Sequence, residues 1–322
     1  MNASKVIMAF SILLALVSSH RAGAEAAYDW SPYQYLLAER YTSPEDLASE
    51  VSVRFAGDEE RAAALFYWVA NSISYDTKLM NRIAGSSIKS YTLAEIERLY
   101  EDRIQYAWKK RKGVCENYAR LYERLATLAG LEAVMISGHA RGDYLTAGMI
   151  GIGHAWNRVK IDGKWQLLDA TWGAGHLNEN LQFEAEFKPQ YFLPEPVTFS
   201  YSHFPEDAND QLLANPVSKV TYLMRPAVGE GFLRYDITEL NLDTYAIEIG
   251  QGNQLTISGM GTDLPSQFIL ANLSTGYQIG GSTEIAGNQF SITMYAEEVA
   301  PMKLGVLNPR GEIVLAYELT VR

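Results

Sequence analysis

The sequence predicts an α+β fold, in which helices pack on an antiparallel sheet, followed by a β-sandwich domain. Three observations support this prediction. Apolar residues recur at helical spacing from residue 43 to about residue 130. Strand-like runs follow over residues 132–170, and helical patterns end at about Pro205. Residues 232–322 contain short β-rich runs separated by turn residues, which is the pattern of a sandwich.

The amino terminus has the pattern of a cleaved signal peptide over residues 1–24. Lys5 precedes an uncharged, largely apolar run at residues 6–17, and Ala22-Gly23-Ala24 fits a small-x-small cleavage site, with Ala24-Glu25-Ala26 as a second candidate. As a helix this run would rise about 18 Å, short of the roughly 30 Å of bilayer hydrocarbon. No other stretch is long and apolar enough to span a membrane. We therefore expect a secreted or periplasmic protein.

Charge and length limit the class of partner and the number of domains. The formal net charge is −11, and loss of Lys5 and Arg21 with residues 1–24 makes it −13 (−11 − 2). This charge disfavours nucleic acid and anionic membrane surfaces as main partners. The remaining 298 residues (322 − 24) suggest two domains, which we place at residues 25–225 and 226–322.

Helix start signals divide the first part of the chain. Ser43-Pro44-Glu45-Asp46 combines an N-cap, a first-position proline and acidic residues in the first turn. A second helix is expected over residues 58–71, and Thr92-Leu93-Ala94-Glu95 is a capping box for a third. The fourth begins at or near Cys115 and ends at Gly130.

Strands are expected after these helices, at residues 132–137, 154–161 and 164–170. The last two are joined by Asp162-Gly163, a pair typical of a two-residue hairpin turn. In the carboxy-terminal part, short strands are expected at residues 245–249, 254–258, 267–271, 289–295, 303–307 and 313–321.

Cys115 is the only cysteine, in a chain that we expect to be exported. A lone thiol cannot form an intrachain disulfide, so it is either an apolar core residue or a reactive group. The positive end of the predicted helix would stabilise a thiolate at this position. The basic residues 109–112 just upstream would act in the same direction, or they form a solvated helix end.

A His–Asp pair follows from the predicted hairpin. If Asp162-Gly163 is a two-residue turn, Trp156 faces Asp169, and His154 becomes the diagonal neighbour of Asp169 on the same face. Diagonal neighbours lie about 7–8 Å apart at the backbone, within reach of an imidazole and a carboxylate. A three-residue loop would put them on opposite faces. With Cys115, these residues are the parts of a cysteine nucleophile site.

Other residues could line this site. Tyr75 is a candidate side-chain donor to an oxyanion, together with the backbone N–H of the nucleophile. Trp156 and Trp172 flank the histidine and aspartate positions as wall or core residues, and His176 follows a glycine-rich loop. We expect His203 to be a packing residue. No cysteine cluster or histidine pair indicates a metal or another cofactor.

The chain contains the motifs GVCENYA at residues 113–119, GHAWN at residues 153–157 and WQLLDATWG at residues 165–173. In this order they resemble the transglutaminase-like superfamily, in particular the branch of the kyphoscoliosis peptidase and the transglutaminase/protease-like cytokinesis proteins. The resemblance covers about residues 43–225. It departs from the family pattern at Asp210-Gln211-Leu212-Leu213, where relatives tend to have a tryptophan before Gln-Leu-Leu.

The resemblance implies a papain-like α+β transglutaminase core with Cys115 as nucleophile, His154 as base and Asp169 as the orienting residue. It also implies acyl transfer through a thioester, which water or an amine then resolves. We expect hydrolysis of an amide in a protein or peptide substrate. The alternatives are transfer of a glutamine acyl group to an amine and a non-catalytic binding or scaffold role. The β-sandwich could bind a partner or substrate or stabilise the first domain.

Overall fold

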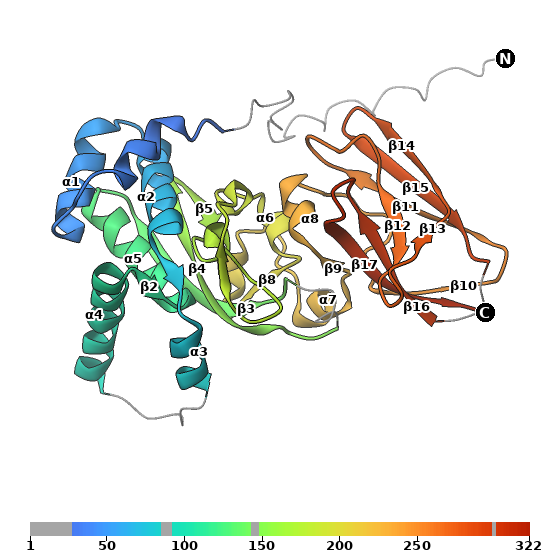
Figure 1. Cartoon of the computed structure of the whole chain (residues 1–322), viewed down its shortest axis with the longest axis horizontal. Coiled ribbons are helices and arrows are strands. Elements are labelled where there is room, and N and C mark those ends of the chain that lie inside the picture. Colours follow the sequence, from blue (N-terminus) through green and yellow to red (C-terminus); the bar gives the residue numbers. More distant parts are fainter. Residues whose placement is uncertain (1–27, 85–91, 143–147, 298–300) are drawn as a thin grey trace, which may run out of the picture.

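The computed structural model describes residues 28–84, 92–142, 148–297 and 301–322. Residues 1–24, where the sequence predicts a signal peptide, lie outside the described residues. Helices form one end of the molecule, an antiparallel sheet lies in the middle, and the carboxy-terminal strands form the other end (Figure 1). Within the described ranges, no helix has the length and apolar character needed to cross a membrane.

Helices build the first layer of the fold. They are η1 (Ser31–Leu37), α1 (Pro44–Arg54), α2 (Asp58–Ser72), α3 (Thr77–Ala84), α4 (Leu93–Lys110) and α5 (Cys115–Leu128). The predicted caps are present. The Ser43 side chain accepts a hydrogen bond from the Asp46 N–H, and Thr92 and Glu95 each cap the other's backbone N–H. Helix α3 has no counterpart among the predicted helices.

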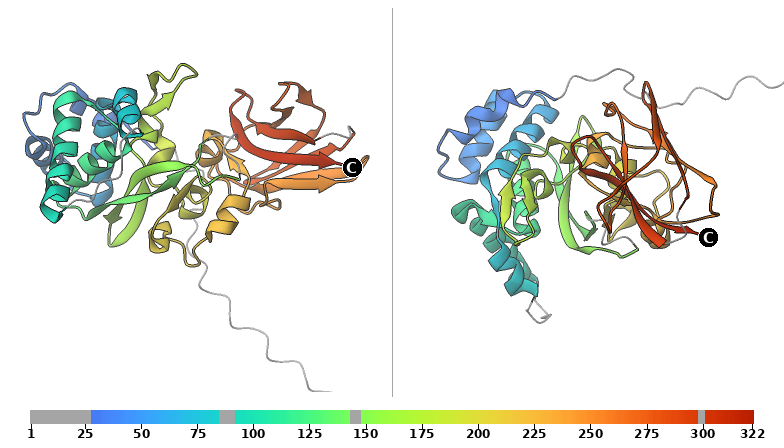
Figure 2. Two further views of the ribbon diagram at one scale, coloured as in Figure 1. Left: turned by 90° about the horizontal axis from the view of Figure 1, so that it is seen from below. Right: turned by 45° about the vertical axis from the view of Figure 1, so that its right-hand side comes forward.

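Helix α5 lies at the centre of this layer. Its residues Tyr118, Leu121, Tyr122 and Leu125 are fully buried, as their spacing predicts. They face α1, α2 and α4 on one side and the sheet on the other. Figure 2 shows these helices, in blue to teal, beside the green strands. Because α5 is packed on both sides, the position of its first residue, Cys115, is fixed relative to the sheet.

The central sheet has the strand order β5-β4-β3-β8, with every neighbouring pair antiparallel. Its strands are β3 (Ala133–Ala140), β4 (Ile152–Ile161), β5 (Lys164–Leu168) and β8 (His203–Pro205). Asp162 and Gly163 both have positive φ, 48° and 80°, and Ile161 pairs with Lys164. This is the two-residue turn that the sequence predicts, and its twist matches that of the flanking strands.

The carboxy-terminal part is a β-sandwich of two sheets. One contains β10 (Ala246–Ile249), β17 (Ile313–Val321), β16 (Pro301–Leu307), β12 (Ile269–Asn272) and β13 (Gln278–Ile279), with β9 (Ala227–Val228) paired to β17. The other contains β11 (Gln254–Met260), β15 (Gln289–Tyr295) and β14 (Ser282–Ala286). Alternate residues are buried, as in Phe290, Ile292 and Met294 on β15, so each sheet turns one apolar face inward.

Short elements connect these parts. They are β1 (Ser74–Tyr75), β2 (Lys112–Gly113), η3 (Trp172–Ala174), β6 (Gly175–Leu177), β7 (Phe183–Ala185), η4 (Pro189–Tyr191), α6 (Pro196–Phe199), η5 (Ala208–Gln211), α7 (Lys219–Met224) and α8 (Glu230–Arg234). Helices α7 and α8 correct the prediction, because they lie beyond Pro205, where no helix was expected. With six and five residues, α7 and α8 are shorter than the window in which helical periodicity can be recognised.

Candidate active site

Cys115 is the first residue of α5 and is partly exposed. Two motif residues hold the backbone around it. The fully buried Asn117 accepts a hydrogen bond from the Val114 N–H at 3.0 Å and donates one to the Arg103 carbonyl at 2.9 Å. A Cβ at Gly113 would lie 2.4 Å from Cβ of Asn117, so glycine is required for this close approach. The sequence around the cysteine therefore fixes where its side chain begins.

His154 and Asp169 form a buried pair next to this helix end. His154 lies on β4, Asp169 follows β5 directly, and the distance from His154 Nε2 to Asp169 Oδ2 is 2.7 Å. The other carboxylate oxygen, Oδ1, accepts from the N–H groups of Thr171 at 2.8 Å and Trp172 at 3.1 Å. The structure thus brings together the two residues that the hairpin register predicts as diagonal neighbours.

The ionisation of the pair depends on its neighbours. Burial alone would lower the pKa of His154, but the Asp169 carboxylate, and then the Cys115 sulfur, outweigh it and raise the pKa. Burial pushes the pKa of Asp169 upward, but His154 and the other donors hold it well below its usual range. Since Nε2 of His154 binds Asp169, Nδ1 is the ring nitrogen left for Cys115. The arrangement favours an imidazolium beside the sulfur.

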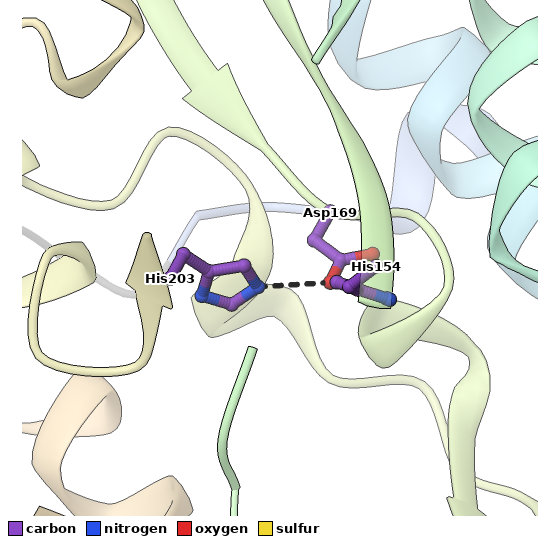
Figure 3. Close-up of side chains that lie close together, drawn as sticks. All are labelled: His154, Asp169 and His203. Atoms are coloured by element: carbon purple, nitrogen blue, oxygen red, sulfur yellow. Dashed lines mark hydrogen bonds and ion pairs between the residues drawn. The ribbon is translucent and has the colours of Figure 1, made fainter. Parts of the chain in front are cut away.

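A second histidine contacts the same carboxylate. Nε2 of His203, on β8, lies 3.2 Å from Oδ2 of Asp169, and its side chain is fully buried. Figure 3 shows the His154 and His203 rings converging on Asp169. Sequence reasoning assigned His203 to packing only. The signal that could have marked it is a histidine inside the His-Phe-Pro segment, but its contact with Asp169 depends on the pairing of β8 with β3.

The remaining predicted site residues lie at different distances from the pair. Burial raises the pKa of Tyr75, and so, to a smaller extent, do Cys115 and then Asp169. Tyr75 is therefore near the His154–Asp169 pair. The Trp172 ring lies 5.3 Å from the His154 ring. Trp156 is 1% exposed, which makes it a core wall residue. His176 is exposed on β6 and contacts Glu184, Glu186 and Lys188.

The basic run at residues 109–112 takes a structural role through one of its members. The guanidinium of Arg111 lies over the rings of Trp68 at 4.5 Å and Trp108 at 4.3 Å, so it packs between two aromatic side chains. Arg111 also closes α4 with a left-handed backbone, φ 52°. Its side chain is therefore committed to packing at the end of α4.

Among the described residues, His154, Asp169 and His203 are one group that offers three ligand atoms within 4.8 Å of one another. Their spacing fits hydrogen bonds better than shared coordination of an ion. Ligand atoms at about 2.0–2.2 Å around a tetrahedral zinc ion lie about 3.3 Å apart, which is longer than the 2.7 Å between His154 Nε2 and Asp169 Oδ2. We therefore treat the cluster as a hydrogen-bonded network.

The chain is similar to several known proteins. It is 30% identical over 177 residues to the kyphoscoliosis peptidase of Mus musculus, which covers 54% of this chain and 25% of that protein. It is 25% identical over 213 residues to hillarin of Drosophila melanogaster, which covers 60% of this chain and 23% of that protein. The chain thus spans about a quarter of the length of these relatives.

A solved structure and a family model also match. The crystal structure of a TGase matches with 19% identity and a TM-score of 0.30, covering 44% of this chain and 37% of that one. The model of the transglutaminase-like superfamily matches residues 45–170, from the first residues of α1 to the residue after Asp169. This segment includes Cys115, His154 and Asp169. The chain therefore carries a domain of the transglutaminase-like superfamily.

Proposed function

We propose that this protein is an exported cysteine-nucleophile acyl-transfer enzyme that hydrolyses amide bonds in a protein or peptide. One observation carries the proposal: Nε2 of His154 is 2.7 Å from the buried Asp169 carboxylate, and after Asp169 the Cys115 sulfur at the start of α5 raises the pKa of His154. The order nucleophile, base and orienting acid is that of a cysteine triad. The name kyphoscoliosis peptidase, given to two relatives, supports hydrolysis.

In the first half of the proposed reaction, His154 takes the proton of the Cys115 thiol. The sulfur attacks the substrate carbonyl carbon, a C–S bond forms, and the carbonyl oxygen becomes an oxyanion. When this intermediate collapses, the C–N bond breaks and the amine leaves with the proton from the His154 imidazolium. Asp169 keeps the proton of His154 on Nε2 and stabilises the imidazolium. The product is a thioester on Cys115.

The second half releases the acid. A water molecule gives one proton to His154 and attacks the thioester carbon, so that a C–O bond forms. The C–S bond then breaks, and the sulfur regains its proton from the imidazolium. In both halves the backbone N–H of Cys115 is a suitable oxyanion donor, because the first N–H groups of a helix have no intrahelical acceptor. The nearby Tyr75 hydroxyl is a candidate second donor.

Two assays test the proposed activity. The first measures cleavage of a labelled unstructured protein, and the second measures incorporation of a labelled primary amine into a glutamine peptide. We expect cleavage without amine incorporation, and loss of cleavage in Cys115→Ala. Amine incorporation that depends on Cys115 would replace hydrolysis by transfer. Absence of both activities, with full cellular function in Cys115→Ala, would favour a scaffold.

Export is tested by sequencing the amino terminus of the mature protein, which we expect at Glu25.

A further inference from the structure

His203 is built into the site more tightly than a packing residue requires. Nε2 of His203 lies 3.2 Å from Asp169 Oδ2, and because a carboxylate only accepts, Nε2 carries the ring proton. Nδ1 lies 2.8 Å from the Ser202 hydroxyl, which is also 3.3 Å from the Phe199 carbonyl oxygen. The ring stacks on Phe199, with centroids 3.7 Å apart and planes 10° from parallel. Both ring nitrogens are therefore paired, and the plane of the ring is fixed.

Asp169 gains a complete set of donors from this contact. Its Oδ1 accepts from two backbone N–H groups, those of Thr171 and Trp172, and its Oδ2 accepts from two imidazoles, those of His154 and His203. A carboxylate held at both oxygens cannot rotate without losing hydrogen bonds in a buried site, where an unpaired charge is costly. His203 is the donor most distant in sequence, 34 residues from Asp169, against 15 or fewer for the others.

We propose that His203 is a positioning residue, which holds the Asp169 carboxylate in the orientation that His154 requires. The inference rests on the proposed function, because it concerns the same site. It makes the active unit a chain of hydrogen bonds from Ser202 through His203 and Asp169 to His154, with Cys115 at the end. Asp169 directly follows β5 and His203 lies on β8, so the two edge strands of the sheet position the two residues of this contact.

Burial keeps His203 a neutral donor. Burial lowers the pKa of His203 to about 4, although Asp169 acts in the opposite direction. The titratable groups facing the ring are Asp169 and His154, and Asp210 lies across a small pocket, paired with Arg158 at 2.6 Å. The His203 N–H is one of the contacts that hold the pKa of Asp169 down. Without it, Asp169 would take up a proton at higher pH.

The test measures the alkylation rate of Cys115 by iodoacetamide as a function of pH. His203→Phe keeps an aromatic ring on Phe199 but removes the donor, and His203→Gln keeps an N–H near the Nε2 position. Because Asp169 would then take up a proton at higher pH, we expect the acid limb of the alkylation profile of His203→Phe to move to higher pH by about half to one unit. In His203→Gln the limb should return toward its wild-type position. His139→Phe, the same change at a histidine of β3, is the matched control and should leave the limb in place.

The outcomes separate this inference from the proposed function. If His154→Ala does not slow alkylation, the thiol–imidazole pairing itself is absent. If His154→Ala slows it but His203→Phe leaves the limb unchanged, only the role of His203 is wrong. An acid limb that is equally displaced in His203→Gln and His203→Phe would also overturn the positioning role of His203. If His203→Phe does not fold, as judged by circular dichroism, Ser202→Ala decides: we expect a smaller upward shift, and an unchanged limb overturns the inference.

Discussion

At the residue scale, one carboxylate gives its two histidines opposite properties. Asp169 raises the pKa of His154 above the ordinary histidine range despite burial, whereas for His203 burial prevails and lowers the pKa. Asp169 lies closer to His154, 2.7 Å against 3.2 Å, and the Cys115 sulfur adds to the rise in the pKa of His154, whereas the charge of His154 lowers the pKa of His203. One imidazole is therefore suited to carry a proton and the other to orient the acceptor.

Asp169→Asn tests this assignment. The pKa of His154 is raised in the folded protein. The imidazolium therefore contributes fully to the stability of the fold at acidic pH, and this contribution is lost as pH rises through the raised pKa. Without the carboxylate, burial lowers that pKa, and the loss begins at lower pH. We expect the alkaline limb of turnover to move to lower pH and kcat to fall by about a thousandfold. An unchanged alkaline limb measured in the folded variant would contradict the assignment.

At the element scale, two features could be predicted from sequence because they are local. The Asp162-Gly163 turn sets the β4–β5 register, which ends with Leu168 opposite Asn157, and Asp169, the next residue, binds His154. The cap at the start of α5 lies within the five residues 113–117. His203 could not be predicted, because its contact depends on β8 pairing with β3, more than sixty residues earlier in the chain. Pattern analysis sees local periodicity and does not see such pairing.

Gly113→Ala tests the start of α5. The added Cβ would lie 2.4 Å from Asn117 Cβ, so Asn117 must move and the Val114 N–H loses its cap. We expect about 1–3 kcal/mol of destabilisation in urea unfolding and slower alkylation of Cys115. Gly153→Ala is the matched control, because nothing lies within 4 Å of a Cβ at that position in β4. Equal stability of the two variants would mean that the helix start tolerates the side chain.

At the scale of the whole molecule, the β-sandwich end is tied to the loop that carries Asp169. The Lys188 N–H donates to the Gly173 carbonyl at 2.9 Å, next to the N–H donors of Asp169. The Lys188 ammonium is 3% exposed and pairs with Glu230 on α8, which packs against β17. Lys188 thus links the turn after Asp169 to the sandwich. We expect this contact to let the carboxy-terminal part stabilise the active-site loop.

The two partners of this ion pair should respond unequally to substitution. Glu230→Gln leaves the buried Lys188 ammonium with one carboxylate, Glu186 at 3.6 Å, and with His176 Nδ1 at 3.4 Å, whereas Lys188→Met leaves Glu230 at the surface, 37% exposed. We expect Glu230→Gln to lower the free energy of unfolding by about 2 kcal/mol and Lys188→Met by less than about 1 kcal/mol.

Urea unfolding measures these changes in both variants and in the double variant. The control is Lys160→Met, which removes an exposed ion pair with Glu132. The double variant should match Lys188→Met, because the unpaired buried charge is then gone. If Glu230→Gln is no more destabilising than Lys188→Met, the sandwich does not stabilise the Asp169 loop through this pair.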